Sequence, residues 1–209
     1  MKILVVSGSQ RTDSNSYELA KVIQENVLTT IEGAESHIID LSRFPFLLDH
    51  YGGRSYEPEL AQGKGQILAM LYDCDAVVFI APEWGGMVPP ALVNLLLLTA
   101  NGSAGGLPLG HKPAFAIGVS ASGGGANPIS LLKAYAAKNS HLVWLPLHAI
   151  VQNVEQFITK DWEPSGSDRF SQVQSRIEVG LNSLAIYAKQ LSGARDELVS
   201  LSKVHPFGQ

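Results

Sequence analysis

Short apolar runs alternate with stretches of helical periodicity along most of the chain. The runs predict five strands, at residues 2–7, 36–41, 76–81, 113–119 and 141–145. The third and fourth runs, AVVFIA and PAFAIGV, are apolar almost throughout, which is typical of parallel strands that are buried on both faces. The pattern therefore favours a parallel sheet.

Apolar residues spaced three or four positions apart predict the helices between these strands. The expected helices span about residues 15–30, 59–72, 89–100 and 128–138, and a long amphipathic helix with an apolar stripe from Phe170 to Leu191 follows. Residues 42–58 and 101–110 have the composition of loops. This alternation implies a doubly wound α/β sheet with right-handed crossovers and helices on both faces. We expect one domain over residues 1–209, because no repeat or linker divides the chain.

The composition limits which partners and which cellular compartment we expect for the protein. Of the 209 residues, 45% are apolar and 16% are charged, so the chain can bury a large core. The net charge of −4 and the lack of a Lys/Arg block argue against nucleic acid and anionic membranes as partners. The longest apolar run, residues 91–100, is too short to span a bilayer, and the first residues lack the features of a signal peptide. We therefore expect a cytoplasmic protein.

Cysteine and histidine occur without a recognisable metal or redox motif. The single cysteine, Cys74, excludes an internal disulfide and a thiolate cluster, and we interpret it as a buried side chain rather than a reactive thiol. The six histidines show no H-x-x-x-H spacing. We expect no metal site and no catalytic acid–base pair.

The loop after the first strand has the composition of an anion site. Its sequence from Ser7 to Ser16, SGSQRTDSNS, combines hydroxyl groups with one arginine just before the first helix. Helix N-termini attract phosphate, and the planar fork of a guanidinium matches a phosphate. The loop lacks both the G-x-G-x-x-G motif of dinucleotide sites and the G-K-[ST] motif of nucleoside triphosphate sites. This favours a monophosphate such as that of FMN; the structural alternative is a helix cap with a solvated Arg11.

Two further loops follow strands at the same expected edge of the sheet, where open parallel sheets bind their ligands. Residues 81–90, APEWGGMVPP, place an aromatic beside two glycines, which suits a heteroaromatic ring whose edge needs hydrogen bonds. Residues 119–127, VSASGGGAN, contain three successive glycines, which let a ligand approach the backbone closely. The alternatives are an ordinary turn and a plain flexible loop, respectively.

The three loops together resemble one known family. The order G-S-x-R-x-x-S after the first strand, P-E-[aromatic] after the third and a glycine-rich loop after the fourth is similar to the NADPH-dependent FMN reductases. That family includes flavodoxin-like quinone, chromate and azo-dye reductases, and the likeness covers residues 1 to about 146. The resemblance implies a flavodoxin-like five-stranded parallel sheet, FMN as cofactor, NADPH or NADH as electron donor, and a homodimer or homotetramer.

The resemblance also implies a role for each matching residue. The FMN phosphate would be held by three residues of the first loop: Ser9, Arg11 and Ser14. Ser16, which stands where the family usually has asparagine, would also bind the cofactor. The ring and the ribityl chain would be lined by the second loop: Pro82, Glu83, Trp84, Gly85 and Gly86. The other side of the ring would be bordered by the third loop: Ser120, Ser122, Gly123 and Gly124. Trp84 and Gly85 replace the Tyr and Asn of the family, and Val93 replaces its Lys.

The expected activity is a ping-pong reaction. NAD(P)H would reduce the flavin, and a quinone, a free flavin, an azo compound or a metal oxyanion would then reoxidise it. The loop that contains Phe44, Phe46 and Tyr51 is expected to overhang the ring, in its own or a partner subunit.

Two other functions stay open at this point. One is an FMN electron carrier, like flavodoxin, without NAD(P)H oxidase activity of its own. The other is an α/β serine hydrolase, although the segment GVSAS at residues 118–122 lacks the last glycine of the nucleophile motif G-x-S-x-G.

Overall fold

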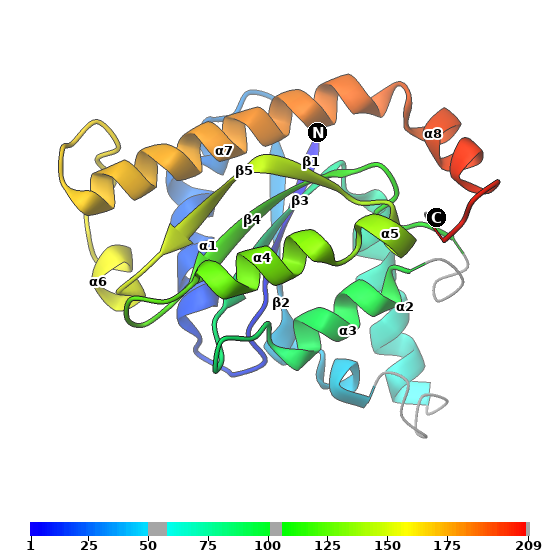
Figure 1. Ribbon diagram of the computed structural model, residues 1–209, viewed down its shortest axis with the longest axis horizontal. Helices are drawn as coiled ribbons and strands as arrows, with labels where there is room; N and C mark the ends of the chain where they lie inside the picture. The colour runs from blue at the N-terminus through cyan, green and yellow to red at the C-terminus, as the bar shows by residue number, and fades with distance from the viewer. Residues whose placement is uncertain (50–57, 101–105, 208–209) are drawn as a thin grey trace.

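The computed structural model describes residues 1–49, 58–100 and 106–207 and has a central sheet of parallel strands (Figure 1). The strands are β1 (Lys2–Ser7), β2 (Glu35–Asp40), β3 (Ala76–Pro82), β4 (Pro113–Val119) and β5 (Val143–Val151). Their order is β2-β1-β3-β4-β5, and every neighbouring pair is parallel. This confirms the flavodoxin-like, doubly wound five-stranded sheet.

Helices cover both faces of the sheet (Figure 1). They are α1 (Asn15–Asn26), α2 (Pro58–Asp73), α3 (Pro90–Leu98), α4 (Ala126–Ala134), α5 (Ala137–Ser140), α6 (Val154–Ile158), α7 (Arg169–Ser192) and α8 (Arg195–Ser202). Three short 3₁₀ helices are η1 (Leu28–Thr30), η2 (Leu41–Arg43) and η3 (Pro45–Asp49). No helix in the described ranges combines the length and the apolar character that crossing a bilayer requires.

Alternate residues of each strand face two separate cores. In β1, Ile3 and Val5 pack with α1 and α7, whereas Leu4 and Val6 pack with α2, α3 and α4. Both sets are buried, which explains why the strand sequence is a continuous apolar run. The two helical layers cover the faces of the sheet and not the edges at the carboxyl and amino ends of its strands.

Local sequence signals fix where several helices begin. Ser14 caps α1, since its Oγ accepts the N–H of Tyr17 at 3.2 Å. Asp168 caps α7 in the same way through the N–H groups of Phe170 and Ser171. These caps set the start of α1 and α7, which pack on the same face of the sheet.

Several expected bounds differ from the structure. The fifth strand runs from Val143 to Val151 instead of ending near residue 145, because β5 lies at the sheet edge and a register shift opposite Ala114 and Ala116 accommodates Pro146. The first helix ends at Asn26 and the fourth at Ala134, where the left-handed Ala136 (φ 61°) interrupts the helical path. The short helices α5, α6 and α8 were not expected.

The segment expected to overhang the ring is partly core structure. Phe46 is buried and packs so closely on Gly63 that a Cβ there would lie 2.9 Å from its ring. Asn94 holds the same segment, because its Nδ2 donates to the Leu47 carbonyl at 2.5 Å. The expectation is therefore wrong for Phe46, whereas Tyr51 lies outside the described residues.

Candidate functional site

The order of strands reverses between β1 and β3, and this point organises the candidate site. The loop after β1 leads to α1 on one face, and the loop after β3 leads to α3 on the other. The loop after β4 leaves the same carboxyl edge beside them. We call these the first loop (residues 8–14), the second loop (residues 83–89) and the third loop (residues 120–125).

The first loop gathers hydroxyl groups and free amides at the start of α1. Ser9, Ser14 and Ser16 are buried, and Ser9 Oγ accepts the N–H of Arg11 at 3.2 Å. Within the described ranges, the N–H groups of Asn15 and Ser16 have no hydrogen-bond partner in the protein. Unpaired amides and the helix dipole make this end of α1 attractive to an anion.

Gly8 lets the first loop press against the neighbouring strand and helix. Its N–H donates to the Ile80 carbonyl at 2.8 Å, and a Cβ on Gly8 would lie 2.6 Å from that oxygen and 2.7 Å from Leu92. Gln10 adds a second link, because its Oε1 accepts the N–H of Ala91 at 3.2 Å, near the start of α3. The first loop is thus joined to both β3 and α3.

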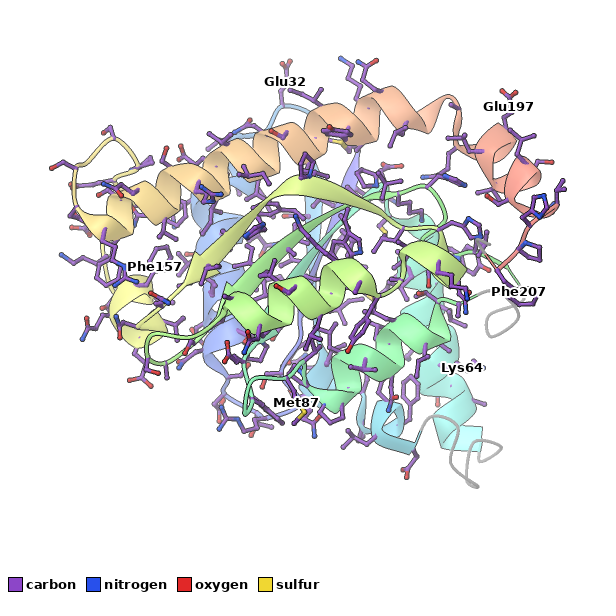
Figure 2. All side chains as sticks on the ribbon, viewed as in Figure 1. Glu32, Lys64, Met87, Phe157, Glu197 and Phe207 are labelled. Atoms are coloured by element: carbon purple, nitrogen blue, oxygen red, sulfur yellow. The ribbon has the colours of Figure 1, made fainter. Side chains whose placement is uncertain are left out.

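The second loop folds into a tight hairpin turn. Trp84 and Met87 exchange two backbone hydrogen bonds of 3.1 and 3.0 Å around Gly85 (φ 57°) and Gly86 (φ 80°). Positive φ at both central positions is typical of a type I′ turn, which explains the pair of glycines. Met87 projects from this turn and is 63% exposed (Figure 2).

Trp84 connects the first two loops. The guanidinium carbon of Arg11 lies 5.2 Å from the centre of the Trp84 ring, within the range of a cation–π contact. The indole Nε1 is buried and has no hydrogen-bond partner among the described residues. A buried donor without a partner costs free energy, so this group is available to an acceptor supplied by a ligand.

The third loop is held by its neighbours on both sides. The Glu83 carboxylate accepts the N–H of Gly125 at 2.5 Å, and the Gln152 amide donates to the carbonyls of Gly123 and Gly124. Ser120 Oγ accepts the N–H of Ser122 at 3.1 Å, inside the loop. Among the described residues no hydrogen bond joins Ser120 to a histidine.

The structure brings the predicted site residues together at one edge and adds two that the sequence did not select. Pro82 ends β3 and is buried, while Gly85, Ser122 and Gly123 are exposed at the rim. Gln10 lies in the first loop, which the sequence already indicated as part of the site, so its position could have pointed to it. Gln152 follows β5 and had no local signal, since its partners are 28 and 29 residues away.

The residues present fit the FMN that the sequence analysis expects. The first loop offers free amides, hydroxyls and one guanidinium for a phosphate. The unpartnered Trp84 Nε1 offers a donor, and a Cβ added at Gly85 or Gly123 would meet no atom within 4 Å, so these backbones are open to a ring. No group of three His, Cys, Asp or Glu side chains in the described residues is arranged to hold a metal ion.

Titratable groups buried near the amino edge of the sheet belong to the scaffold. Cys74 is buried, and burial raises the pKa of its thiol, so it stays protonated at neutral pH. The Lys112 ammonium donates to the carbonyls of Leu71 and Tyr72 at 2.6 and 2.8 Å and so caps the end of α2, while burial lowers its pKa. Cys74 is therefore a buried side chain, as the sequence favoured.

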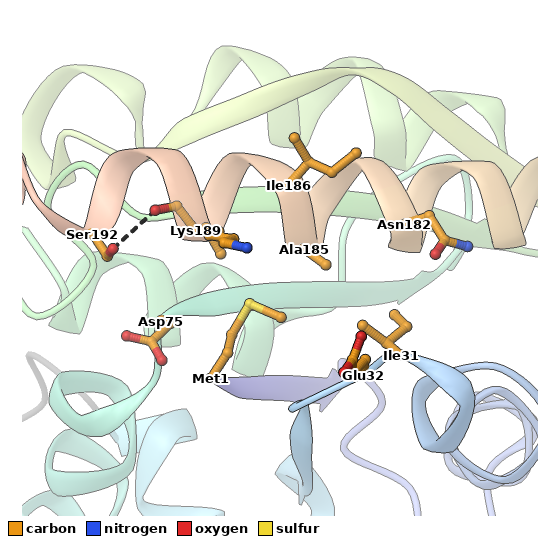
Figure 3. Close-up of a pocket in the computed structure, with 10 residues that line it drawn as sticks. Met1, Ile31, Glu32, Asp75, Asn182, Ala185, Ile186, Lys189 and Ser192 are labelled. Carbon is orange, nitrogen blue, oxygen red and sulfur yellow. Dashed lines mark hydrogen bonds between the residues drawn. The ribbon is translucent and has the colours of Figure 1, made fainter.

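A groove of about 550 Å³ lies at the amino edge of the sheet, beside α7 (Figure 3). It is lined by Met1 and Asp75, which precede β1 and β3, by Ile31, and by Ala185 and Lys189 of α7. Because Met1 and Asp75 stand at the amino ends of their strands and the three loops at the carboxyl ends, this groove is separate from the candidate site.

Comparison with known proteins agrees with the fold and identifies a family. Residues 1–156 match the family model described as NADPH-dependent FMN reductase. An oxidoreductase from Corynebacterium diphtheriae has a similar structure, with a TM-score of 0.63 and 15% identity over 90% of this chain and 97% of that one. The flavoenzyme NAD(P)H:(acceptor) oxidoreductase FerB from Paracoccus denitrificans has a TM-score of 0.60 and 20% identity over the same shares. No curated protein matches the sequence.

Proposed function

The chain belongs to the NADPH-dependent FMN reductase family, and from this premise we propose that it is an FMN-dependent NAD(P)H oxidoreductase that reduces small acceptors by a ping-pong mechanism. The acceptor classes are a quinone, a free flavin, an azo compound or a metal oxyanion. Membership of the family establishes flavin-dependent oxidoreductase chemistry in general terms. What we propose beyond it is the class of acceptor and the ping-pong mechanism.

The proposal gives each loop one part of the cofactor. Ser9, Arg11, Ser14 and Ser16 hold the phosphate with the free amides at the start of α1. The second loop, with Pro82, lines the ring and the ribityl chain through Trp84, the open backbone of Gly85 and the backbone of Gly86. Ser120, Ser122, Gly123 and Gly124 border the other side of the ring.

When bound, FMN would supply the redox chemistry, that is, hydride acceptance from the nicotinamide and electron donation to the acceptor. The protein groups bind and orient. Arg11 neutralises phosphate charge, and the Glu83 carboxylate supports the third loop through Gly125 instead of transferring a proton. No residue is proposed as a catalytic acid or base.

The contact between Arg11 and Trp84 carries the proposal. It joins the first and second loops across the point where the strand order reverses, so the expected phosphate anchor and ring platform lie against each other. Neither a hydrolase nor a simple helix cap requires this juxtaposition.

Two measurements on the FMN-loaded protein test the function. Stopped-flow mixing with NADPH or NADH should bleach the flavin absorbance, and a second mixing with a quinone should restore it. Steady-state rates at several quinone concentrations should give parallel double-reciprocal lines. A flavin that binds but stays oxidised with both nicotinamides would identify an electron carrier, and a protein that binds no FMN would overturn the assignment.

Assembly into a homodimer or homotetramer is part of the same proposal. An apolar groove of about 380 Å³ runs between α3 and the α4–α5 segment, and it includes Val93, Leu97 and Tyr135. Leu97 is 41% exposed on this surface. Light scattering should give a multiple of the chain mass, and Leu97→Glu should reduce it. Leu201→Glu, at an exposed leucine on α8, is the matched control.

A further inference from the structure

The third loop is supported by one polar side chain from each neighbouring strand. β4 lies between β3 and β5, and the residues that follow these two strands are Glu83 and Gln152. Glu83 accepts a hydrogen bond from the loop, whereas Gln152 donates to it. Glu83 therefore binds an N–H group of the loop, and Gln152 binds two of its carbonyl groups.

These hydrogen bonds fix the orientation of two successive peptide units. In a planar trans peptide the C=O and the N–H point in opposite directions. The carbonyl of Gly124 is held by Gln152 and the N–H of Gly125 by Glu83, so this peptide is held at both ends. The preceding peptide has its Gly123 carbonyl on Gln152, which directs the Gly124 N–H away from Gln152.

The Gly124 N–H remains free. No described residue accepts a hydrogen bond from it. The neighbouring space is narrow, because a Cβ on Gly124 would lie 3.0–3.2 Å from the Glu83 carboxylate atoms. The loop thus presents a bare amide donor at the carboxyl edge, in an orientation that Gln152 maintains.

Such a lock matters because glycine peptides reorient at little cost. Successive glycines allow either the C=O or the N–H to face a ligand. Reduction by a hydride leaves negative charge on a flavin ring, so a fixed N–H beside the ring stabilises the reduced form more than the oxidised form. A carbonyl in the same place has the opposite effect.

We propose that Gln152 is a positioning residue that sets the flavin's reduction potential by keeping the Gly124 N–H turned toward the cofactor. This inference rests on the proposed function, and it concerns the relative affinity for oxidised and reduced FMN rather than the presence of activity. Gln152 acts through the peptide and does not touch the reacting atoms.

The test uses Gln152→Met, which keeps the length of the side chain and removes the donor, together with Gln152→Ala. We expect the affinity for reduced FMN to fall about tenfold more than the affinity for oxidised FMN. For a two-electron couple this ratio corresponds to a midpoint potential about 30 mV lower. Potentials are measured by equilibration with a reference dye, and affinities by fluorescence titration of the apoprotein.

Gln156→Ala is the matched control, because Gln156 is an exposed glutamine on α6 whose side chain has no hydrogen bond in the described structure. Its potential should equal that of the wild type. Equal potentials in Gln152→Met and wild type, with both folded by circular dichroism, would overturn the inference while leaving the proposed function intact. A wild-type chain that binds no FMN would overturn both.

Discussion

The first and third loops reach the same edge of the sheet but are held in different ways. In the first loop, Ser9 and Ser14 accept N–H groups from residues two and three positions ahead. In the third loop, Glu83 and Gln152 act from 42 and from 28 to 29 residues away. The first loop thus combines local serine hydrogen bonds with the contacts of Gly8 and Gln10 to β3 and α3. The third loop has one local serine hydrogen bond, and its other side-chain supports come from residues that the sheet brings beside it.

This difference has a consequence for mutation. A change of the Arg11 side chain should act on the ligand that the first loop binds, since the hydrogen bonds of this loop use the side chains of Ser9, Gln10 and Ser14 instead. A change under the third loop should act on the loop's shape first and on ligands second. The predictions below separate these two kinds of effect.

The largest effect is expected for Gly118→Ala at the base of the third loop. A Cβ there would lie 2.0 Å from the Gly125 carbonyl oxygen and 3.0 Å from Ile129, so the loop and the start of α4 must move. We expect a loss of about 3 kcal/mol in the free energy of unfolding, measured with urea. Gly123→Ala is the control in the same loop, because no atom lies within 4 Å of its Cβ position, and it should change stability by less than about 0.5 kcal/mol.

The next effect sharpens the role of the first loop. Arg11→Ala should weaken FMN binding by roughly 30-fold, because a charge-assisted hydrogen bond to phosphate is lost. The affinity of Arg11→Ala for riboflavin, which has no phosphate, should equal that of the wild type. The FMN affinity of Arg11→Lys should lie between those of the wild type and Arg11→Ala. Fluorescence titration measures all three. An equal loss for FMN and riboflavin would show that Arg11 acts through the Trp84 ring instead of the phosphate.

A smaller effect is expected for Trp84→Phe in the second loop. The replacement keeps an aromatic ring and removes the buried, unpartnered Nε1. Stability of the apoprotein should therefore stay within about 1 kcal/mol, whereas FMN affinity should fall about fivefold if the indole N–H finds its acceptor on the cofactor. Urea unfolding without FMN gives the stability, and titration with FMN gives the affinity. A loss of apoprotein stability with unchanged FMN affinity would contradict a hydrogen bond from the indole to the cofactor.

The smallest effect is expected from pH and lies away from all three loops. Burial, and then the neighbouring His141, lower the pKa of His111, whose ring nitrogen lies 2.7 Å from Ser202 Oγ on α8. A histidine with a lowered folded pKa favours the folded state above its ordinary pKa of about 6.5, and this contribution is lost as the pH falls through the folded value.

Urea midpoints should therefore decrease modestly from pH 7.5 to pH 5.5, and less so in His111→Gln. The pH dependence of FMN affinity should be the same in the wild type and in His111→Gln. A histidine-dependent change in FMN affinity would show that this region and the loops are coupled.

The sequence predicted most of the sheet and the first loop because their signals are local. Continuous apolar runs identified β1, β3 and β4 to within one residue at either end, and Ser14 marks the start of α1. The true length of β5 was hidden by Pro146, which breaks a central strand but is tolerated at an edge with a register shift.

Other features could not be predicted because they depend on distant residues. Phe46 was expected in a loop that overhangs the ring, whereas it is buried against Gly63 of α2, a contact that no local sequence signal indicates. Gln152 is one of many polar residues after a strand, and its role follows from the sheet order that places β5 beside β4. Glu83 was selected by resemblance for the ring, whereas its carboxylate binds a backbone amide of the third loop.

The single hydrogen bond from Ala91 to Gln10 ties the first loop to α3, the helix that forms one wall of the exposed apolar groove. Thermodynamic linkage is reciprocal, so if assembly through that groove tightens the grip on a phosphate, phosphate occupancy strengthens assembly by the same factor. Under that coupling, dilution would separate empty subunits at a higher concentration than loaded ones, and each subunit would report its occupancy to its neighbour.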